Sequence, residues 1–128
     1  MIRGTGIDLV TVETFEELCR NALFVEKHFT PAERLYAEKA AGPASLRLAA
    51  RYAAKESFIK ALGEMHLFRP RRLKSVDYKE IEVAHDPEGR PYLLFHGAFR
   101  KIVEELKITS HLSLSHDGGY AVAQVLLT

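Results

Sequence analysis

The longest helical pattern in the chain runs from Ala44 to Leu62, between the pair Gly42-Pro43 and Gly63. The proline stops any helix that precedes it, and Gly63 is predicted to form a left-handed C-terminal cap. At 100° per residue, four side chains share one narrow face of this helix: Ala49, Ala53, Glu56 and Lys60. A carboxylate and an ammonium group therefore rise from small residues, which leave room for a ligand near the helix backbone.

The same spacing has a simpler interpretation. Glu56 and Lys60 are four residues apart, and an exposed ion pair at this spacing contributes about 0.2–0.5 kcal/mol. For an isolated Glu-x-x-x-Lys pattern, such a solvated pair is the more common outcome. Arg51 and Lys55 form a positive strip on another side of the helix, which we also expect to be solvated. A functional role for Glu56 and Lys60 therefore needs support from other parts of the chain.

The flanking segments predict one α+β domain covering residues 1–128. Strands are expected at 2–10, 80–85, 90–96, 110–115 and 120–127, and an Asp86-Pro87-Glu88-Gly89 turn joins the second strand to the third. Thr14 and Glu17 have the spacing of a capping box, and Thr30-Pro31-Ala32-Glu33 is a second helix start. A short amphipathic helix is expected at 97–106. This order favours a mainly antiparallel sheet packed against the long central helix.

Composition excludes several classes of protein. With 128 residues, 47% hydrophobic and 27% charged, the chain is large enough for one core. It has no apolar run that could span a bilayer and no apolar segment typical of a signal peptide. Cys19 is the single cysteine, and we interpret it as a small apolar residue of a helix. These features predict a cytoplasmic protein with no membrane partner.

The formal net charge of +1 argues against a general nucleic-acid binder. The charge is uneven, however, because four basic residues lie within six positions: Arg69, Arg71, Arg72 and Lys74. A solvated loop is the usual outcome for such a cluster, and the chain has no interleaved set of aromatic residues for stacking nucleic-acid bases. A non-catalytic module that binds a polyanion through Arg69–Lys74 is the alternative function.

Two further polar residues occupy positions where ligands often bind. Asp8 lies in an apolar strand after Gly4 and Gly6, although an acid at a strand end also commonly accepts backbone hydrogen bonds. His116 follows an alternating strand and precedes a glycine turn, where a turn histidine without a role is the more common case. His111 is expected to be structural.

Asp8, Glu56 and Lys60 together are the residue types that magnesium-dependent phosphate chemistry needs. Mg²⁺ takes one or two protein carboxylates and completes its shell with water and substrate phosphate. A lysine stabilises the charge on phosphate oxygens as a bond breaks. No Walker loop, dinucleotide fingerprint, zinc-spaced Cys/His set or serine-hydrolase motif is present, and Gly4-Thr5-Gly6 is too short to cradle a phosphate alone.

Four segments carry a resemblance to a known family: Gly6-Ile7-Asp8-Leu9, Phe29-Thr30-Pro31-Ala32-Glu33, the run from Arg51 to Gly63, and His111-Leu112-Ser113-Leu114-Ser115-His116-Asp117. Together they resemble the small 4′-phosphopantetheinyl transferases of the holo-acyl-carrier-protein synthase type. The resemblance runs essentially end to end, and Ala53-Ala54-Lys55-Glu56 is its most specific part.

The resemblance implies transfer of the phosphopantetheine arm of coenzyme A to a serine of an apo acyl carrier protein, with release of adenosine 3′,5′-bisphosphate. It also implies a homotrimer with sites at subunit interfaces. Asp8 and Glu56 would hold Mg²⁺ on the pyrophosphate, and Lys60 would contact its oxygens. The other expected contacts with coenzyme A are Arg51 and His116, toward the 3′-phosphate, and Gly63. The base for the serine is either Glu56 or a metal-bound water.

The family usually has an arginine at the start of the first helix, where the acidic carrier protein docks. Residues 12–17 of this chain are acidic instead. Either the carrier docks on other basic residues, such as Arg20, Arg71 and Arg72, or the enzyme serves an unusual carrier; a loss of steering charge affects the association rate more than the chemistry. A degenerate subunit that only fills an oligomer is a further alternative, but it would not need Asp8, Glu56 and Lys60 together.

Overall fold

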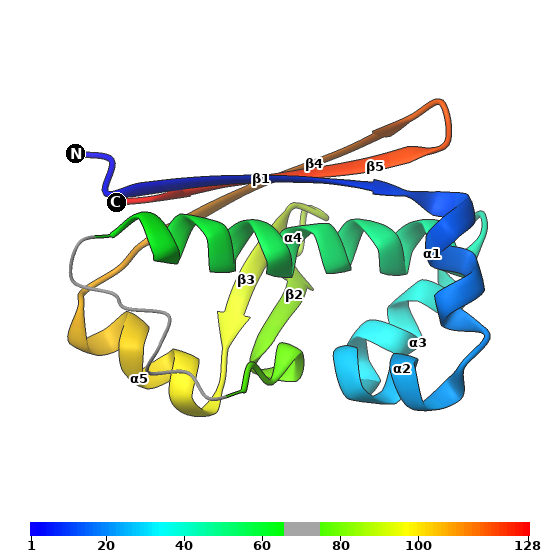
Figure 1. The fold of residues 1–128 in the computed structure, drawn as a ribbon, viewed down its shortest axis with the longest axis horizontal. Helices are drawn as coiled ribbons and strands as arrows, with labels where there is room; N and C mark the ends of the chain where they lie inside the picture. The colour runs from blue at the N-terminus through cyan, green and yellow to red at the C-terminus, as the bar shows by residue number, and fades with distance from the viewer. Residues whose placement is uncertain (66–74) are drawn as a thin grey trace.

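The computed structural model describes residues 1–65 and 75–128, and the predicted α+β class is confirmed (Figure 1). The elements, in chain order, are β1 (Gly4–Thr11), α1 (Val12–Cys19), α2 (Ala22–His28), α3 (Pro31–Lys39), α4 (Ala44–Glu64), the 3₁₀ turn η2 (Tyr78–Glu80), β2 (Ile81–His85), β3 (Pro91–Phe95), α5 (Gly97–Glu105), β4 (Ser110–Asp117) and β5 (Tyr120–Leu127). The basic cluster Arg69–Lys74 lies outside the described residues.

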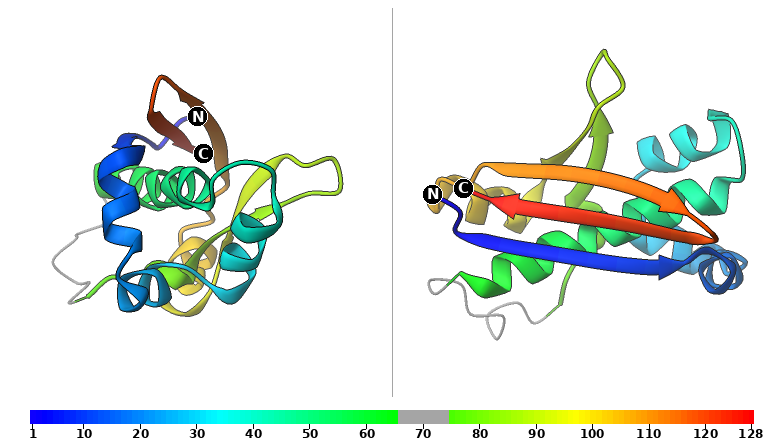
Figure 2. Two further views of the ribbon diagram at one scale, coloured as in Figure 1. Left: turned by 90° about the vertical axis from the view of Figure 1, so that its right-hand side faces the viewer. Right: turned by 90° about the horizontal axis from the view of Figure 1, so that it is seen from above.

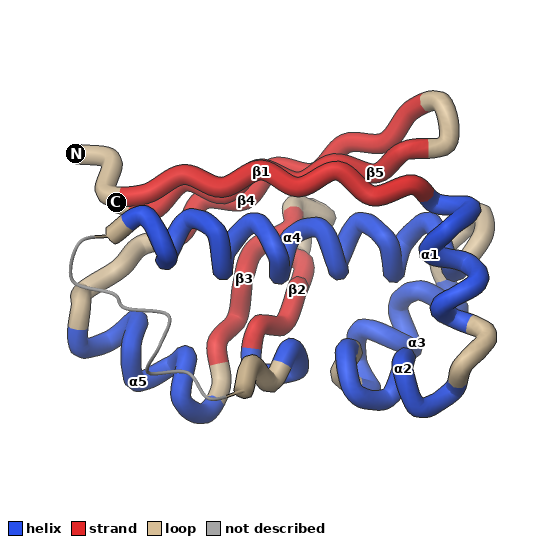
Figure 3. The backbone as a smooth tube through the Cα atoms, viewed as in Figure 1, coloured by secondary structure: helices blue, strands red, loops and turns tan. Residues whose placement is uncertain are grey.

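The described strands form two antiparallel sheets on the long helix α4. One sheet has the order β1-β5-β4, and the hairpin β2-β3 forms the other. Helix α4 runs along one face of the three-stranded sheet, and the hairpin crosses behind α4 in Figure 1, with β3 in contact with β4 (Figures 1 and 2). The tubes in Figure 3 show α1, α2 and α3 gathered at one end of α4, with α5 near the other end.

Strand β1 lies unusually close to α4 because two of its inward positions are glycines. A Cβ atom at Gly4 would overlap the carbonyl oxygen of Ala61, and one at Gly6 would overlap the carbonyl oxygen of Ser57. The Gly4-Thr5-Gly6 segment therefore brings strand and helix backbones together. Ser57 adds a bond across the same layer, since its Oγ donates to the carbonyl oxygen of Ala123 in β5 at 2.9 Å.

Helix α4 contributes to two apolar clusters. The larger one lies between α4, the two sheets and α5, and Phe58 packs there against Phe95 and Phe99. The smaller one lies under α1 to α3, where Phe15 contacts Phe29. Helix α4 is therefore buried along much of its length, and its buried residues include Arg51, Lys55 and Ser57.

The helix ends show which local predictions were correct. The Thr30 capping box is confirmed: the Thr30 side chain accepts from the Glu33 backbone, and the Glu33 carboxylate accepts from the Thr30 backbone. The capping box at Thr14 is wrong, because α1 begins at Val12 and a separate helix follows, with Asn21 as its N-cap. The left-handed cap at Gly63 is also wrong, since α4 continues through that residue to Glu64.

Candidate active site

Asp8 and Glu56 line one hollow of about 410 Å³ between β1, α1 and α4. We call it the carboxylate hollow. Asp8 follows Gly4 and Gly6 on the face of β1 that turns toward α4, and that close approach brings its carboxylate to the helix that carries Glu56. The two acids are 48 positions apart in the sequence (56 − 8), and the packing of β1 on α4 unites them.

Lys60 joins Asp8 rather than Glu56. Its Nζ donates to Asp8 Oδ1 at 3.0 Å and to the carbonyl oxygen of Ile7 at 2.9 Å. The helix ion pair between Glu56 and Lys60 that the spacing suggested is therefore not the contact the structure makes. Since the Lys60 side chain is half exposed, its pairing with Asp8 contributes little to stability and leaves the ammonium group accessible.

Glu56 is held from another side by a tyrosine of η2. The Tyr78 hydroxyl donates to Glu56 Oε1 at 2.6 Å, and the Tyr78 ring stacks on Tyr52 with centroids 5.7 Å apart. Burial raises the pKa of both hydroxyls, and the negative charge of Glu56 raises it further. The pKa of Tyr52 rises to about 12. Both phenols therefore stay protonated near neutral pH.

The carboxylate hollow offers a donor set that suits Mg²⁺. Within residues 1–65 and 75–128, no group of three or more His, Cys, Asp or Glu side chains gathers as a metal cluster. Asp8 and Glu56 supply two carboxylates, which is the number that Mg²⁺ takes when water and phosphate oxygens complete its shell. Hard oxygen donors without thiolate or imidazole fit this ion and disfavour zinc.

Arg51 and His116 line a second, smaller hollow of about 140 Å³, which we call the arginine hollow. The Arg51 side chain is buried, with its guanidinium carbon 4.2 Å from the centre of the Tyr36 ring. Its Nη1 donates to the carbonyl oxygen of Arg47, whereas its Nε and Nη2 have no hydrogen-bond partner among the described residues. Burial lowers the pKa of Arg51. Buried donors without acceptors suit an anionic ligand.

The two hollows lie on opposite sides of α4. At 100° per residue, Tyr52 and Glu56 of the carboxylate hollow point about 180° away from Arg47 and Ala50 of the arginine hollow. One subunit therefore keeps its expected 3′-phosphate contacts apart from its expected metal ligands. Gly63 lines neither hollow and lies about 18 Å along the helix axis from Arg51.

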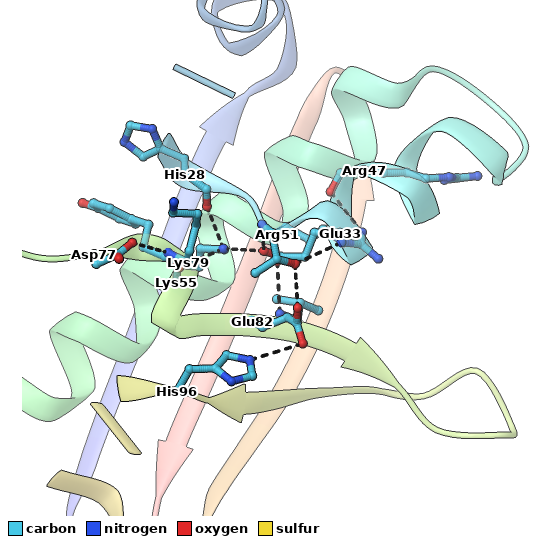
Figure 4. Close-up of polar contacts among 12 residues, drawn as sticks. His28, Glu33, Arg47, Arg51, Lys55, Asp77, Lys79, Glu82 and His96 are labelled. Carbon is cyan, nitrogen blue, oxygen red and sulfur yellow. Dashed lines mark hydrogen bonds and ion pairs between the residues drawn. The ribbon is translucent and has the colours of Figure 1, made fainter. Parts of the chain in front are cut away.

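Lys55 corrects the expectation of a solvated positive strip, because its side chain and that of Glu33 are fully buried. Its Nζ donates to Glu33 Oε1 at 2.6 Å and to the carbonyl oxygens of His28 and Tyr78 at 2.7 and 2.9 Å. Figure 4 shows the ammonium group directed into this set of acceptors. Glu33 also accepts from the backbone N–H of Val83 at 3.1 Å. Lys55, one residue of the segment Ala53-Ala54-Lys55-Glu56, thus makes buried structural contacts.

That role could not be read from the pattern of α4, since a lysine one position before Glu56 looks like part of an exposed face. The one available signal was Glu33, an acid inside a helix start that also matches the family motif.

Arg20 is exposed at the end of α1, as a docking residue must be, while Arg71 and Arg72 lie outside the described residues. None of the described helices has the length and apolar character needed to cross a membrane.

Known proteins resemble this chain along almost its whole length. The profile of the 4′-phosphopantetheinyl transferase superfamily matches residues 4–125. A holo-[acyl-carrier-protein] synthase from Syntrophus aciditrophicus is 44% identical over 130 aligned positions, which cover 99% of this chain and 96% of that protein.

Two similar solved structures are complexes with CoA. An ACPS–CoA complex from Chronobacterium ammoniagenes has a TM-score of 0.83 and 37% identity, and covers 98% of this chain and 96% of that one. A holo-(acyl-carrier-protein) synthase from Bacillus anthracis in complex with CoA (3′,5′-ADP) has a TM-score of 0.75 and 33% identity, with 99% and 96% covered. The chain therefore belongs to the 4′-phosphopantetheinyl transferase superfamily.

Proposed function

We propose that this protein is a holo-[acyl-carrier-protein] synthase, which transfers 4′-phosphopantetheine from coenzyme A to a serine of an apo acyl carrier protein. The observation that carries the proposal is the meeting of Asp8, Glu56 and Lys60: both acids line one hollow, and the ammonium group of Lys60 contacts Asp8. Relatives with this name match along almost the whole chain, and two related structures hold coenzyme A.

Each residue of the carboxylate hollow has a stated task in this reaction. Asp8 and Glu56 would hold Mg²⁺ against the pyrophosphate of coenzyme A, and the ion would neutralise charge on the bond that breaks. Lys60 would exchange its contact with Asp8 for the phosphate oxygens and stabilise the leaving adenosine bisphosphate. The serine of the carrier gives its proton to Glu56 or to a water molecule, and both acceptors remain candidates.

The arginine hollow would take the 3′-phosphate. Its support is the pair of Arg51 nitrogen atoms, Nε and Nη2, that have no partner within residues 1–65 and 75–128, together with His116 in the lining of the hollow. Because this hollow and the carboxylate hollow lie on opposite sides of α4, the proposal combines the two from different subunits. Gly63 remains a candidate contact for coenzyme A at the far end of the helix.

A homotrimer is part of the proposal. The face of the three-stranded sheet turned away from α4 is not covered by any described element and exposes apolar side chains, including Ile7 and Leu9 at 61% and 62%. Apolar area of this kind on a sheet marks an interaction surface. Sedimentation velocity tests it: a trimer is expected, and a monomer at micromolar concentration would contradict the shared site.

Carrier docking through Arg20, with Arg71 and Arg72 as further candidates, remains a proposal, as does a cytoplasmic location. The exposed acids of α1, such as Glu13 and Glu17, would repel an acidic partner.

The cytoplasmic location is supported by the single cysteine, Cys19, since the chain cannot form an internal disulfide.

Intact-mass spectrometry tests the function. The purified protein is incubated with coenzyme A, Mg²⁺ and purified apo carrier proteins of fatty-acid and polyketide type. We expect at least one carrier to gain the mass of phosphopantetheine. The gain should disappear with EDTA and with the isosteric variants Asp8→Asn and Glu56→Gln, while urea unfolding shows that both variants stay folded. Unmodified carriers in every reaction would refute the transferase and favour the polyanion-binding module.

A further inference from the structure

Tyr78 is attached to α4 at both of its ends. Its hydroxyl donates to Glu56 Oε1 at 2.6 Å, and its backbone carbonyl oxygen accepts from Lys55 Nζ at 2.9 Å. Lys55 and Glu56 are consecutive residues of α4. The hydroxyl contact has the length of a charge-assisted O–H···O⁻ hydrogen bond, which is stronger and more directional than a neutral one.

The support behind Tyr78 is rigid. Lys55 also pairs with Glu33, and both side chains are fully buried. This pair holds the ammonium group of Lys55 in place, and with it the carbonyl oxygen of Tyr78 that accepts from it. The Tyr78 ring has two aromatic neighbours: it stacks on Tyr52 with an interplanar angle of 14°, and its centroid lies 4.8 Å from that of the His28 ring. The position of the hydroxyl is therefore set by packing and by a buried ion pair.

Glu56, in contrast, is only partly buried and stands at the edge of the carboxylate hollow. Without this bond from Tyr78, the Glu56 side chain would sample several rotamers. A ligand that binds only one of them would bind more weakly, because binding would then reduce the conformational entropy of Glu56. A hydrogen bond from an outer residue to a ligating carboxylate fixes its orientation, and loss of such a bond typically lowers metal affinity or activity by about 10–100-fold.

We propose that Tyr78 is a positioning residue for the reaction: its hydroxyl holds the Glu56 carboxylate in the orientation that receives the metal–coenzyme A complex. This inference rests on the proposed function of the carboxylate hollow. Lys55 and Glu33 act one step further back, by holding the backbone of Tyr78 against α4. The alternative is that the Tyr78 ring only fills space in the aromatic cluster and its hydroxyl is incidental.

The test is the variant Tyr78→Phe, which keeps the ring and removes the hydroxyl. The matched control is Tyr92→Phe on β3, since Tyr92 is exposed and its hydroxyl makes no hydrogen bond within the described part of the chain. Calorimetric titration of coenzyme A is carried out at several Mg²⁺ concentrations without carrier, alongside transfer kinetics. Urea unfolding without metal reports the stability of each variant.

We expect Tyr78→Phe to need about 10-fold or more Mg²⁺ for half-maximal coenzyme A binding and half-maximal rate, with the KM for the carrier unchanged. Tyr92→Phe should behave as the wild type in both measurements. Wild-type metal dependence in Tyr78→Phe would overturn the proposal and leave Tyr78 a packing residue. The proposal would also be overturned if Tyr78→Phe lost coenzyme A binding and transfer rate equally at every Mg²⁺ concentration, in step with a lower free energy of unfolding.

The outcome for the proposed function is read separately, from transfer by the wild type. If the wild type modifies no carrier but binds coenzyme A with Mg²⁺, the transferase fails while the binding titrations still decide the role of Tyr78. If the wild type shows no metal-dependent binding of coenzyme A, the role of Tyr78 fails as well.

Discussion

Lys60 is the residue whose contact differs most between the resting site and the proposed reaction. Its ammonium group now pairs with Asp8 at 3.0 Å, and transfer would move it to phosphate oxygens whose charge grows as the bond breaks. We therefore expect Lys60→Ala to lower kcat by about 100-fold and to change the Kd for coenzyme A by less than about threefold. Steady-state kinetics and calorimetry measure the two effects.

The control for this variant is Lys101→Ala, which removes an exposed lysine of α5 far from the hollow. It should leave kcat and the Kd unchanged. A Lys60→Ala enzyme with weak coenzyme A binding and normal kcat would place Lys60 in ground-state binding rather than at the breaking bond.

Tyr52 gives the site a measurable signature at alkaline pH. Its folded-state pKa of about 12 lies above the ordinary value of 10.0, because of burial and the charge of Glu56. The native protein keeps this proton where the unfolded chain loses it, so the contribution to stability is complete below pH 10 and is lost as the pH rises toward 12. The wild type should lose more free energy of unfolding between pH 9 and pH 11 than Tyr52→Phe does. Equal losses in urea unfolding would contradict the raised pKa.

At the scale of elements, the approach of β1 to α4 places Asp8. A methyl group at Gly6 would overlap the carbonyl oxygen of Ser57, so Gly6→Ala should lower the free energy of unfolding by about 1–3 kcal/mol. It should also displace Asp8, which follows Gly6 by two residues in β1. Gly63→Ala is the matched control. It meets no atom within 4 Å and should raise stability by about 0.5–1 kcal/mol.

Urea unfolding of both glycine variants measures the effect on stability, and transfer assays on Gly6→Ala measure the effect on the site. If Gly6→Ala is as stable and active as the wild type, the packing of β1 on α4 does not govern the site.

The buried pair of Lys55 and Glu33 joins α3, α4 and β2. Lys55→Met leaves the Glu33 carboxylate buried without its cation, and we expect a loss of about 3–5 kcal/mol in the free energy of unfolding. The double variant Glu33→Gln with Lys55→Met should recover part of this loss. Lys27→Met, at an exposed position of α2, is the control. A loss below about 1 kcal/mol for Lys55→Met would show that the pair is not a structural anchor.

Local patterns predicted the elements well where one signal dominated. The Thr30 capping box and the hairpin around Asp86 to Gly89 are confirmed, since caps and tight turns are determined by a few neighbouring residues. The predictions at Thr14 and Gly63 failed: α1 begins directly after β1 at Val12, and α4 continues through Gly63 to Glu64, whose carboxylate accepts from the Thr5 backbone of β1. Local spacing does not contain such tertiary contacts.

For the molecule as a whole, the sequence predicted the fold class and the family, and the structure brings Asp8 and Glu56 to one hollow. The helical spacing already placed Arg51 on another side of α4 from Glu56, but it could not predict that Arg51 and Lys55 are buried or that a hollow forms beside Arg51. Both depend on which side of the helix each neighbouring element covers. In the function that we propose, one molecule of coenzyme A would occupy both hollows, and a second subunit would supply one of them.

The central claim is that Asp8 and Glu56 bind one divalent ion beside the pyrophosphate of coenzyme A. A crystal structure of the protein with coenzyme A and Mn²⁺ in place of Mg²⁺, with anomalous diffraction measured at the manganese edge, tests it directly. We predict one strong anomalous peak within about 2.5 Å of a carboxylate oxygen from each acid and of a phosphate oxygen. Coenzyme A bound with no peak between the two carboxylates, or with the peak on other residues, would contradict the account.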